Sequence, residues 1–436
     1  MQEKSGRTNR RVKKLNAEHI DRLGVSLGDR PVGTLSAGAR GAIHFEYSPA
    51  WLATGFDLSP RSSLQFTPTL QQETDRLFKG LHGVFADSLP DGWGHLLMDR
   101  ALRLQQGWHP GEITPLDRLS YMGSRGMGAL TYAPETDGFT GTTSVDLGAL
   151  ALAVVNFMSG QDDDVLRELM LLGGSPGGAR PKVVLARNAG SGESISGFDQ
   201  LPPGYAHWLV KFRAQPDPID AGRAEYTYAQ MAMLAGLDMP PTDLIEVTVA
   251  QQRESFFAVK RFDRVGSRAV HMLSMSGYLN ASHRLPSIGY ETILGATWRI
   301  TQSTEEVAKA FRLMVFNVLA CNRDDHAKNF AFLHDGSWRL SPAFDLTMSA
   351  GPGGEHSSDI NGSGNPARKD IMAIANMFHI VGAEQIVEEV REAVSQWPAM
   401  AATYGVSRRQ IAETGALIDK MVSRIGAAST HKPLRK

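Results

Sequence analysis

Residues 321–345 read CNRDDHAKNFAFLHDGSWRLSPAFD, and this stretch decides how we interpret the C-terminal half of the chain. Phe330–Leu333 and Trp338–Phe344 are short segments typical of strands, and the HDGS between them is a turn sequence. A hairpin brings the residue before its first strand next to the residue after its second strand. Asn329 and Asp345 occupy these positions, so we expect their side chains to lie together at the open end of the hairpin.

A carboxylate and a carboxamide placed together suit Mg²⁺, which takes one or two protein oxygens and completes its shell with phosphate and water oxygens. Asp324 precedes Asn329 by five residues, which is the Asp-x-x-x-x-Asn spacing of kinase catalytic loops. We therefore predict Asp324 as the catalytic base and Asn329 and Asp345 as metal ligands. Asp325 remains an alternative base, because only the spacing favours Asp324.

The alternative for this stretch is a solvated turn whose Asp and Asn side chains only cap neighbouring elements. A single Asp-x-x-x-x-Asn match would favour that alternative. The hairpin and the additional Asp345 favour the catalytic interpretation instead. A long helix is predicted just before the loop, over residues 303–322, because Ser303 and Glu306 have capping-box spacing and apolar residues follow on one face.

A strand-rich unit is predicted upstream, and it suits the roof of a nucleotide site. Its strands are VVLA (183–186), HWLVKF (207–212), DLIEVTVA (243–250) and FFAVKRF (256–262), with a helix over 223–237. Lys211 shares one strand face with His207 and Leu209, and phosphoryl transfer needs such a cation to offset phosphate charge. An edge lysine is the alternative. Glu225 is a candidate partner for Lys211, although acidic residues also favour helix starts.

A glycine cluster, GGSPGG at residues 173–178, precedes this unit. Its backbone N–H groups could cradle phosphates. It is not a Walker loop, because Ala179 stands where that motif requires lysine. A flexible linker is the commoner meaning of such a cluster.

The composition is that of an ordinary globular protein. Lys and Arg number 45 against 46 Asp and Glu, which argues against direct DNA binding and against attraction to a membrane surface. The single cysteine, Cys321, excludes an internal disulfide, and we expect a cytoplasmic location. No apolar run is long enough to span a bilayer. We interpret residues 1–15 as a basic flexible tail.

Several motifs, taken in order, resemble those of the HipA family of serine/threonine kinase toxins. They are VGTL, FEYSPAWL, FADSLPDGWG, LGGSPGGARPKVVLA, HWLVKF, AVKRFDR, NRDDHAKNFAF and LSPAFDLTMS. The resemblance implies an α+β fold with a protein-kinase-like bilobal core, a mixed α/β N-terminal subdomain and a largely helical C-terminal lobe. The expected parts are residues 16–140 for the N-terminal subdomain, 141–265 for the nucleotide-binding lobe and 266–430 for the catalytic lobe.

The resemblance also implies roles for individual residues. ATP and Mg²⁺ are the expected cofactors, with Lys211 at the phosphates and backbone groups of Lys260 to Phe262 at the adenine. Asp263 is expected near the ribose, and Ser175 is expected to be self-phosphorylated, which would inactivate the enzyme. The nucleotide-binding residues in the glycine cluster and just beyond it are expected to be Gly177, Gly178 and Ala179.

The expected function is phosphoryl transfer to a protein serine or threonine by the toxin of a toxin–antitoxin pair. The resemblance implies a helix-turn-helix antitoxin as partner, contact with DNA only through that antitoxin, and a substrate such as an aminoacyl-tRNA synthetase. Three features depart from the family pattern: Asp325 puts an extra negative charge beside the proposed base, Lys260 replaces a glutamate, and an acidic residue is lacking after Arg264. The last two weaken claims about a particular target. Two alternatives remain: a small-molecule phosphotransferase, and a non-catalytic partner of a DNA-binding antitoxin.

Overall fold

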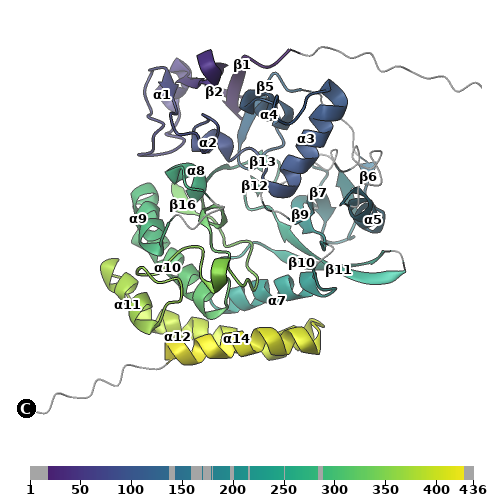
Figure 1. The fold of residues 1–436 in the computed structure, drawn as a ribbon, viewed down its shortest axis with the longest axis vertical. Helices are drawn as coiled ribbons and strands as arrows, with labels where there is room; N and C mark the ends of the chain where they lie inside the picture. Colours follow the sequence, from purple (N-terminus) through teal and green to yellow (C-terminus); the bar gives the residue numbers. More distant parts are fainter. Residues whose placement is uncertain are drawn as a thin grey trace, which may run out of the picture.

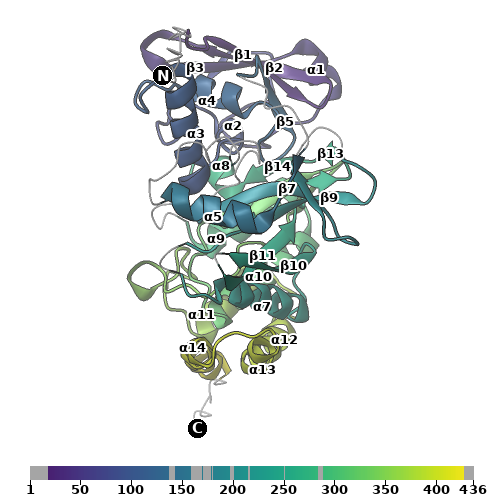
Figure 2. The ribbon, with the colours of Figure 1, turned by 90° about the vertical axis from the view of Figure 1, so that its right-hand side faces the viewer.

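The structure is a computed structural model of the 436-residue chain. It describes residues 18–136, 143–158, 169, 178, 180–196, 201–214, 217–249, 251–282 and 288–426. Figures 1 and 2 show an elongated molecule with the N-terminal residues at one end, a strand-rich region in the middle and the last helices at the other end. The predicted basic tail lies outside the described residues.

The N-terminal part is built on an antiparallel sheet of five strands in the order β4-β3-β2-β1-β5. The strands are β1 (Arg22–Leu27), β2 (Arg30–Ala37), β3 (Ile43–Tyr47), β4 (Gln71–Gln72) and β5 (Leu130–Ala133). Its helices are α1 (Pro49–Thr54), α2 (Gly83–Ala86), α3 (Gly92–Gln106) and α4 (Pro115–Met122). The mixed α/β character predicted for this part is confirmed, because it contains both a sheet and helices.

A six-stranded antiparallel sheet forms the middle of the molecule, in the order β10-β11-β9-β7-β8-β6. The strands are β6 (Thr143–Ser144), β7 (Lys182–Asn188), β8 (Ser194–Ser196), β9 (Tyr205–Lys211), β10 (Thr242–Val249) and β11 (Gln252–Lys260). Two helices accompany them, α5 (Leu147–Met158) and α7 (Ala221–Leu234). The four strands and the helix predicted here are confirmed to within a few residues.

The predicted hairpin is present as β15 (Ala331–His334) and β16 (Trp338–Leu340). A third strand, β14 (His271–Ser274), pairs with β15 and was not predicted. A separate two-stranded ribbon, β12 (Arg264–Val265) with β13 (Arg268–Ala269), precedes it. The short helix α8 (Met275–Leu279) follows β14 directly.

The remaining elements are helical, as predicted. They are α9 (Tyr290–Thr301), α10 (Thr304–Leu319), α11 (Arg368–Met377), α12 (Ala383–Val394), α13 (Trp397–Thr403) and α14 (Arg408–Gly426). The loop before β15 contains a 3-10 turn, η2 (Ala327–Asn329). None of the helices in the described part of the chain combines the length and the hydrophobicity needed to cross a lipid bilayer.

Two apolar cores hold these parts together. One runs without a break from the N-terminal sheet through α9 and α10 to α14. The other joins α3 and α5 to one face of the six-stranded sheet, through Trp208 and Val210 of β9. Because α3 belongs to the N-terminal part, this part packs on both remaining parts of the chain, and the opposite face of β9 is left for a cavity.

Candidate active site

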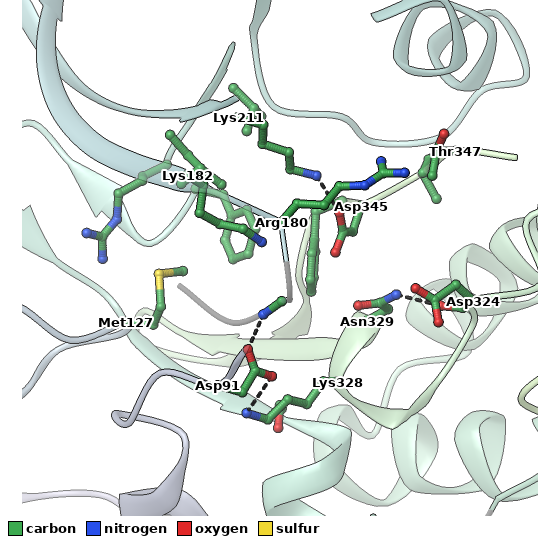
Figure 3. Close-up of a pocket in the computed structure, with 18 of the residues that line it drawn as sticks. Asp91, Met127, Arg180, Lys182, Lys211, Asp324, Lys328, Asn329, Asp345 and Thr347 are labelled. Atoms are coloured by element: carbon green, nitrogen blue, oxygen red, sulfur yellow. Dashed lines mark hydrogen bonds and ion pairs between the residues drawn. The ribbon is translucent and has the colours of Figure 1, made fainter. Parts of the chain in front are cut away.

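A cavity of about 580 Å³ lies where the three parts of the molecule meet. The sheet contributes Leu209 and Lys211 from β9, which is the strand face on which the sequence placed them. The loop before the hairpin contributes Asp324 and Asn329, and Asp345 comes from beyond it. The structure therefore brings together, in one cavity, the residues that were predicted as base, metal ligands and phosphate contact (Figure 3).

Asn329 is held in a defined orientation. Its Nδ2 donates to the backbone carbonyl of Asp324 at 2.6 Å, which leaves its Oδ1 toward the cavity in Figure 3. The η2 turn is fixed from within the loop, because the Lys328 N–H donates to His326 Nδ1 at 3.2 Å. Asn329 and Asp345 thus line the same cavity, and the carboxamide oxygen of Asn329 faces it.

Asp345 is the electrostatic centre of the site. Its backbone has a positive φ of 58°, a conformation uncommon for a non-glycine residue and frequent at functional sites. Lys211 Nζ donates to Asp345 Oδ1 and to Glu225 Oε1 of α7, which confirms the predicted pairing with Glu225. Burial alone would lower the pKa of Lys211, but the two carboxylates raise it above its ordinary value, so Lys211 is a cation.

Asp345 is likewise ionised and carries a negative charge. Burial acts to raise its pKa, and the ammonium groups of Lys211 and Lys182 outweigh that effect and hold the pKa below its ordinary range. The side chain nevertheless keeps 34% of its surface exposed, on the cavity side. An ionised carboxylate with an accessible oxygen is what a divalent cation requires.

Lys182 is a residue that the sequence interpretation missed. It begins β7, lies opposite Lys211 in the β7–β9 register and lines the cavity. Burial lowers its pKa, the Asp345 carboxylate counteracts this, and nearby Lys211 lowers it further. Like charges opposite each other on neighbouring strands are destabilising. Two buried lysines that line one cavity suit an anionic ligand, and Lys182 was missed because it directly precedes the continuously buried VVLA run.

The two neighbouring aspartates of the loop have different surroundings. Asp324 keeps 58% of its side chain exposed, and its Oδ1 lies 3.8 Å from His326 Nε2. Partial burial raises the pKa of Asp324, His326 counteracts this, and Asp345 raises it further. Asp325 is fully buried and does not line the cavity, so the structure favours Asp324 over Asp325 as the group that can reach a substrate.

Part of the cavity lining is apolar. It includes Leu209, Ala229, Met239, Phe257, Val259, Phe262, Phe344 and Leu346. Lys260 and Phe262 line it as expected, but the backbone N–H of Lys260 already donates to Pro241 O and that of Arg261 to His207 O, both at 2.9 Å. Among the backbone N–H groups of residues 260–262, that of Phe262 is the candidate donor to a ligand.

The ribose contact expected for Asp263 is not supported. Its carboxylate is completely buried and accepts from Arg261, Arg264 and the Gly128 N–H, so its oxygens are already used. It does not line the cavity. Asp263 instead holds the Gly126–Gly128 loop of the N-terminal part against the sheet. The residues next to Asp263 in the sequence do not predict this long-range contact.

Part of the glycine cluster lies beyond what the structure describes. Ser175, Gly177 and Ala179 are outside the described residues, whereas Gly178 lines the cavity with a positive φ of 110°. The Gly178 N–H donates to Asp91, a residue of the N-terminal part that the sequence interpretation also missed.

Comparisons with known families agree with this arrangement. The HipA N-terminal domain matches residues 23–133, and the HipA-like C-terminal domain matches residues 174–397, more than half of the chain. The chain belongs to the HipA family. Both matches confirm the family resemblance that the sequence motifs indicated.

Two relatives and one solved structure illustrate the relationship. The chain is 31% identical over 153 residues to the candidate kinase Y4dM of Sinorhizobium fredii. The aligned region covers 32% of this chain and 36% of that protein. The chain is 25% identical over 359 residues to the candidate kinase Y4mE of the same organism, covering 74% and 76%. The matched region thus spans about a third of the first relative and three quarters of the second.

The fold is similar to that of the HipA chain in a complex with HipB and operator DNA from Shewanella oneidensis MR-1. The TM-score is 0.67 at 16% identity, covering 92% of this chain and 97% of that one. This similarity confirms the mixed α+β architecture with an N-terminal antiparallel sheet and a helical C-terminal part.

Proposed function

We propose that this HipA-family protein is a serine/threonine-protein kinase that uses ATP and Mg²⁺. The observation that carries the proposal is the convergence of Asp324, Asn329, Asp345 and two buried lysines on one cavity. The charged residues of that lining suit a triphosphate, and its apolar residues suit a flat base. The six-stranded sheet and the helical part, residues 141–265 and 266–430, would be the two lobes, beside an N-terminal subdomain of residues 16–140.

Each side chain has a role that follows from its surroundings. Lys211 and Lys182 would offset the phosphate charge, and the backbone of Phe262 would face the adenine. Asp345 and the Asn329 oxygen would hold Mg²⁺, which when bound neutralises charge on the phosphate oxygens. Asp324 would accept the proton of the attacking hydroxyl, since it is the exposed carboxylate of the loop.

We further propose that the protein is the cytoplasmic toxin of a toxin–antitoxin pair, controlled by phosphorylation of Ser175. Family membership and the HipA structure solved with HipB and operator DNA support this part. A helix-turn-helix antitoxin would be its partner, any contact with DNA would be through that antitoxin, and an aminoacyl-tRNA synthetase is one candidate substrate. Mass spectrometry of the purified chain before and after incubation with ATP tests Ser175: a gain of one phosphate there is expected, and an unmodified Ser175 would contradict this form of control.

The kinase proposal is tested with γ-labelled ATP, Mg²⁺ and a cell extract. We expect label in a protein band with the wild-type chain and a loss of about 10²- to 10⁴-fold in Asp324→Asn. Asp345→Ala should be at least as inactive. The matched control is Asp335→Ala, an aspartate in the turn of the same hairpin that pairs with Arg268 at 2.7 Å and does not line the cavity.

The outcomes separate the alternatives. Label only in soluble metabolites would replace the protein-kinase proposal by a small-molecule phosphotransferase. No transfer by the wild-type chain, with full growth inhibition retained in Asp324→Asn, would show that the protein acts without catalysis.

A further inference from the structure

Asp91 stands at the N-cap of α3 but does not cap that helix. Asp at an N-cap normally accepts from the N–H of the second or third helical residue. Here the side chain makes no such bond. One oxygen accepts from the Gly178 N–H instead, and the other lies 3.2 Å from Lys328 Nζ. The helix thus gives up a stabilising cap, and Asp91 lines the cavity.

Gly178 and Lys328, which both contact Asp91, come from the two other parts of the site. Lys328 directly precedes the predicted metal ligand Asn329, and Gly178 closes the glycine cluster before β7. The adjacent Trp93 reinforces the second connection: its backbone N–H donates to Gly178 O at 3.1 Å, and its Nε1 donates to Lys182 O at 3.0 Å. The start of α3 therefore joins the glycine cluster, the Lys182 strand and the catalytic loop.

The ion pair itself is largely shielded from water. Lys328 and Asp91 expose only 17% and 12% of their side chains, and Figure 3 shows them next to each other at the lower side of the cavity. A lysine side chain has four rotatable bonds, so a fixed carboxylate partner restricts where its ammonium group can lie. Lys328 lines the cavity, so a bound triphosphate could attract its ammonium group.

We propose that Asp91 is a positioning residue of the phosphoryl-transfer site, acting through Lys328. The N-terminal domain would then be a working part of the active site and not only its cover. This inference rests on the proposed kinase function and extends it, because it assigns a role in the reaction to a residue outside the kinase-like lobes.

The test is a double-mutant cycle with Asp91→Asn and Lys328→Met. Asn at position 91 can still accept from the Gly178 N–H, but it lacks the charge that holds Lys328. We expect kcat to fall about 10- to 100-fold, the size of effect expected from a small misplacement of a reacting group. KM for ATP should stay equal or fall, because a negative charge near the triphosphate has been removed. The double variant should be no slower than Lys328→Met alone.

Nucleotide binding gives a readout that does not need turnover. The dissociation constant of a fluorescent, non-hydrolysable ATP analogue should not rise in Asp91→Asn. The matched control is Asn280→Ala, which removes a contact between the same two parts of the molecule, Asn280 Nδ2 to Glu73 Oε2 at 2.9 Å, away from the cavity. It should leave kcat and the dissociation constant unchanged.

Three results would overturn the inference. The first is wild-type kcat in Asp91→Asn. The second is a cycle in which the effects of Asp91→Asn and Lys328→Met on kcat simply add. The third is a rise in KM and in the dissociation constant together with a loss of stability, and this result would indicate a merely structural contact. The kinase proposal would survive each of them if Asp324→Asn is still inactive. If the wild-type chain transfers no phosphate, the role assigned to Asp91 is rejected together with the kinase proposal.

Discussion

Asp324 and Asp325 are adjacent in the sequence but have opposite surroundings in the structure. The Asp325 carboxylate accepts from Tyr290 Oη at 2.9 Å, His356 Nδ1 at 2.8 Å and the Ser357 N–H at 2.9 Å. It therefore anchors the loop that follows the hairpin, and it leaves Asp324 as the carboxylate that faces the cavity. The departure from the family pattern at Asp325 is thus a buried structural group that does not line the cavity.

This contrast gives a prediction in which stability and activity separate. Asp325→Ala leaves several buried donors without an acceptor, so we expect the free energy of unfolding to fall by about 3 kcal/mol or more. Asp324→Ala should change it by less than about 0.5 kcal/mol, because most of that side chain is exposed, yet it should abolish phosphoryl transfer. Urea denaturation and the labelled-ATP assay measure the two effects. A stable, inactive Asp325→Ala together with an active Asp324→Ala would reverse the assignment.

The sequence interpretation placed a residue in the cavity where a short stretch of sequence fixes the position of that residue. Asp324, Asn329 and Asp345 could be placed because one hairpin fixes all three. Lys182 and Asp91 could not, because their roles depend on contacts between strands or domains far apart in the sequence. Asp263 was misassigned for the same reason: the family pattern suggested a ribose contact, whereas its fourth donor, Gly128, lies 135 residues away.

At the scale of elements, the helix α10 shows a related difference. Ser303 accepts from the Glu306 N–H at 3.3 Å, as a capping box requires. Glu306 does not complete the box, because its carboxylate accepts from the Leu340 N–H at 2.6 Å. Sequence spacing thus predicted where α10 begins, but it could not predict that Glu306 connects α10 to strand β16 of the hairpin.

Glu306 should therefore stabilise the hairpin, and we predict that Glu306→Ala lowers the free energy of unfolding by about 1–3 kcal/mol, since the Leu340 N–H loses a buried acceptor. Hydrogen exchange at that N–H should become faster. Glu305→Ala is the matched control one position earlier: Glu305 is 77% exposed and pairs only with Lys309 on the same helix, so its loss should cost at most about 0.5 kcal/mol. Equal losses in the two variants would show that Glu306 acts only through the helix.

For the whole molecule, the central question is what docks the N-terminal domain. Apolar packing is extensive, because α3 packs on the six-stranded sheet and the N-terminal sheet shares a core with α9 and α10. At the cavity, polar contacts fix the alignment. Asp263 binds the Gly128 N–H, and Arg261 and Arg264 both donate to Gly126 O, so the loop that carries Met127 into the cavity is held at both ends.

This polar junction predicts a specific dependence on pH. Burial alone would raise the pKa of Asp263, but Arg261 and Arg264 outweigh it and lower the pKa to about 2, from an ordinary value of 3.8. A carboxyl whose pKa is lowered by folding stabilises the folded state at pH values above its ordinary pKa, and this contribution is lost as the pH falls toward the lowered value. The stabilisation by Asp263 should thus be complete above about pH 5 and should decline between about pH 4 and pH 2.

Asp263→Asn tests this, because it removes the charge and leaves two buried guanidinium groups without their carboxylate. We expect a loss of about 3–5 kcal/mol at pH 7, measured by urea denaturation, with the difference from wild type constant down to about pH 5 and narrowing below pH 4. Asp335→Asn is the control, since its pair with Arg268 is exposed and should contribute at most about 1 kcal/mol. A large but pH-independent loss in Asp263→Asn would mean that the shape of the side chain, and not its charge, holds the N-terminal domain in place.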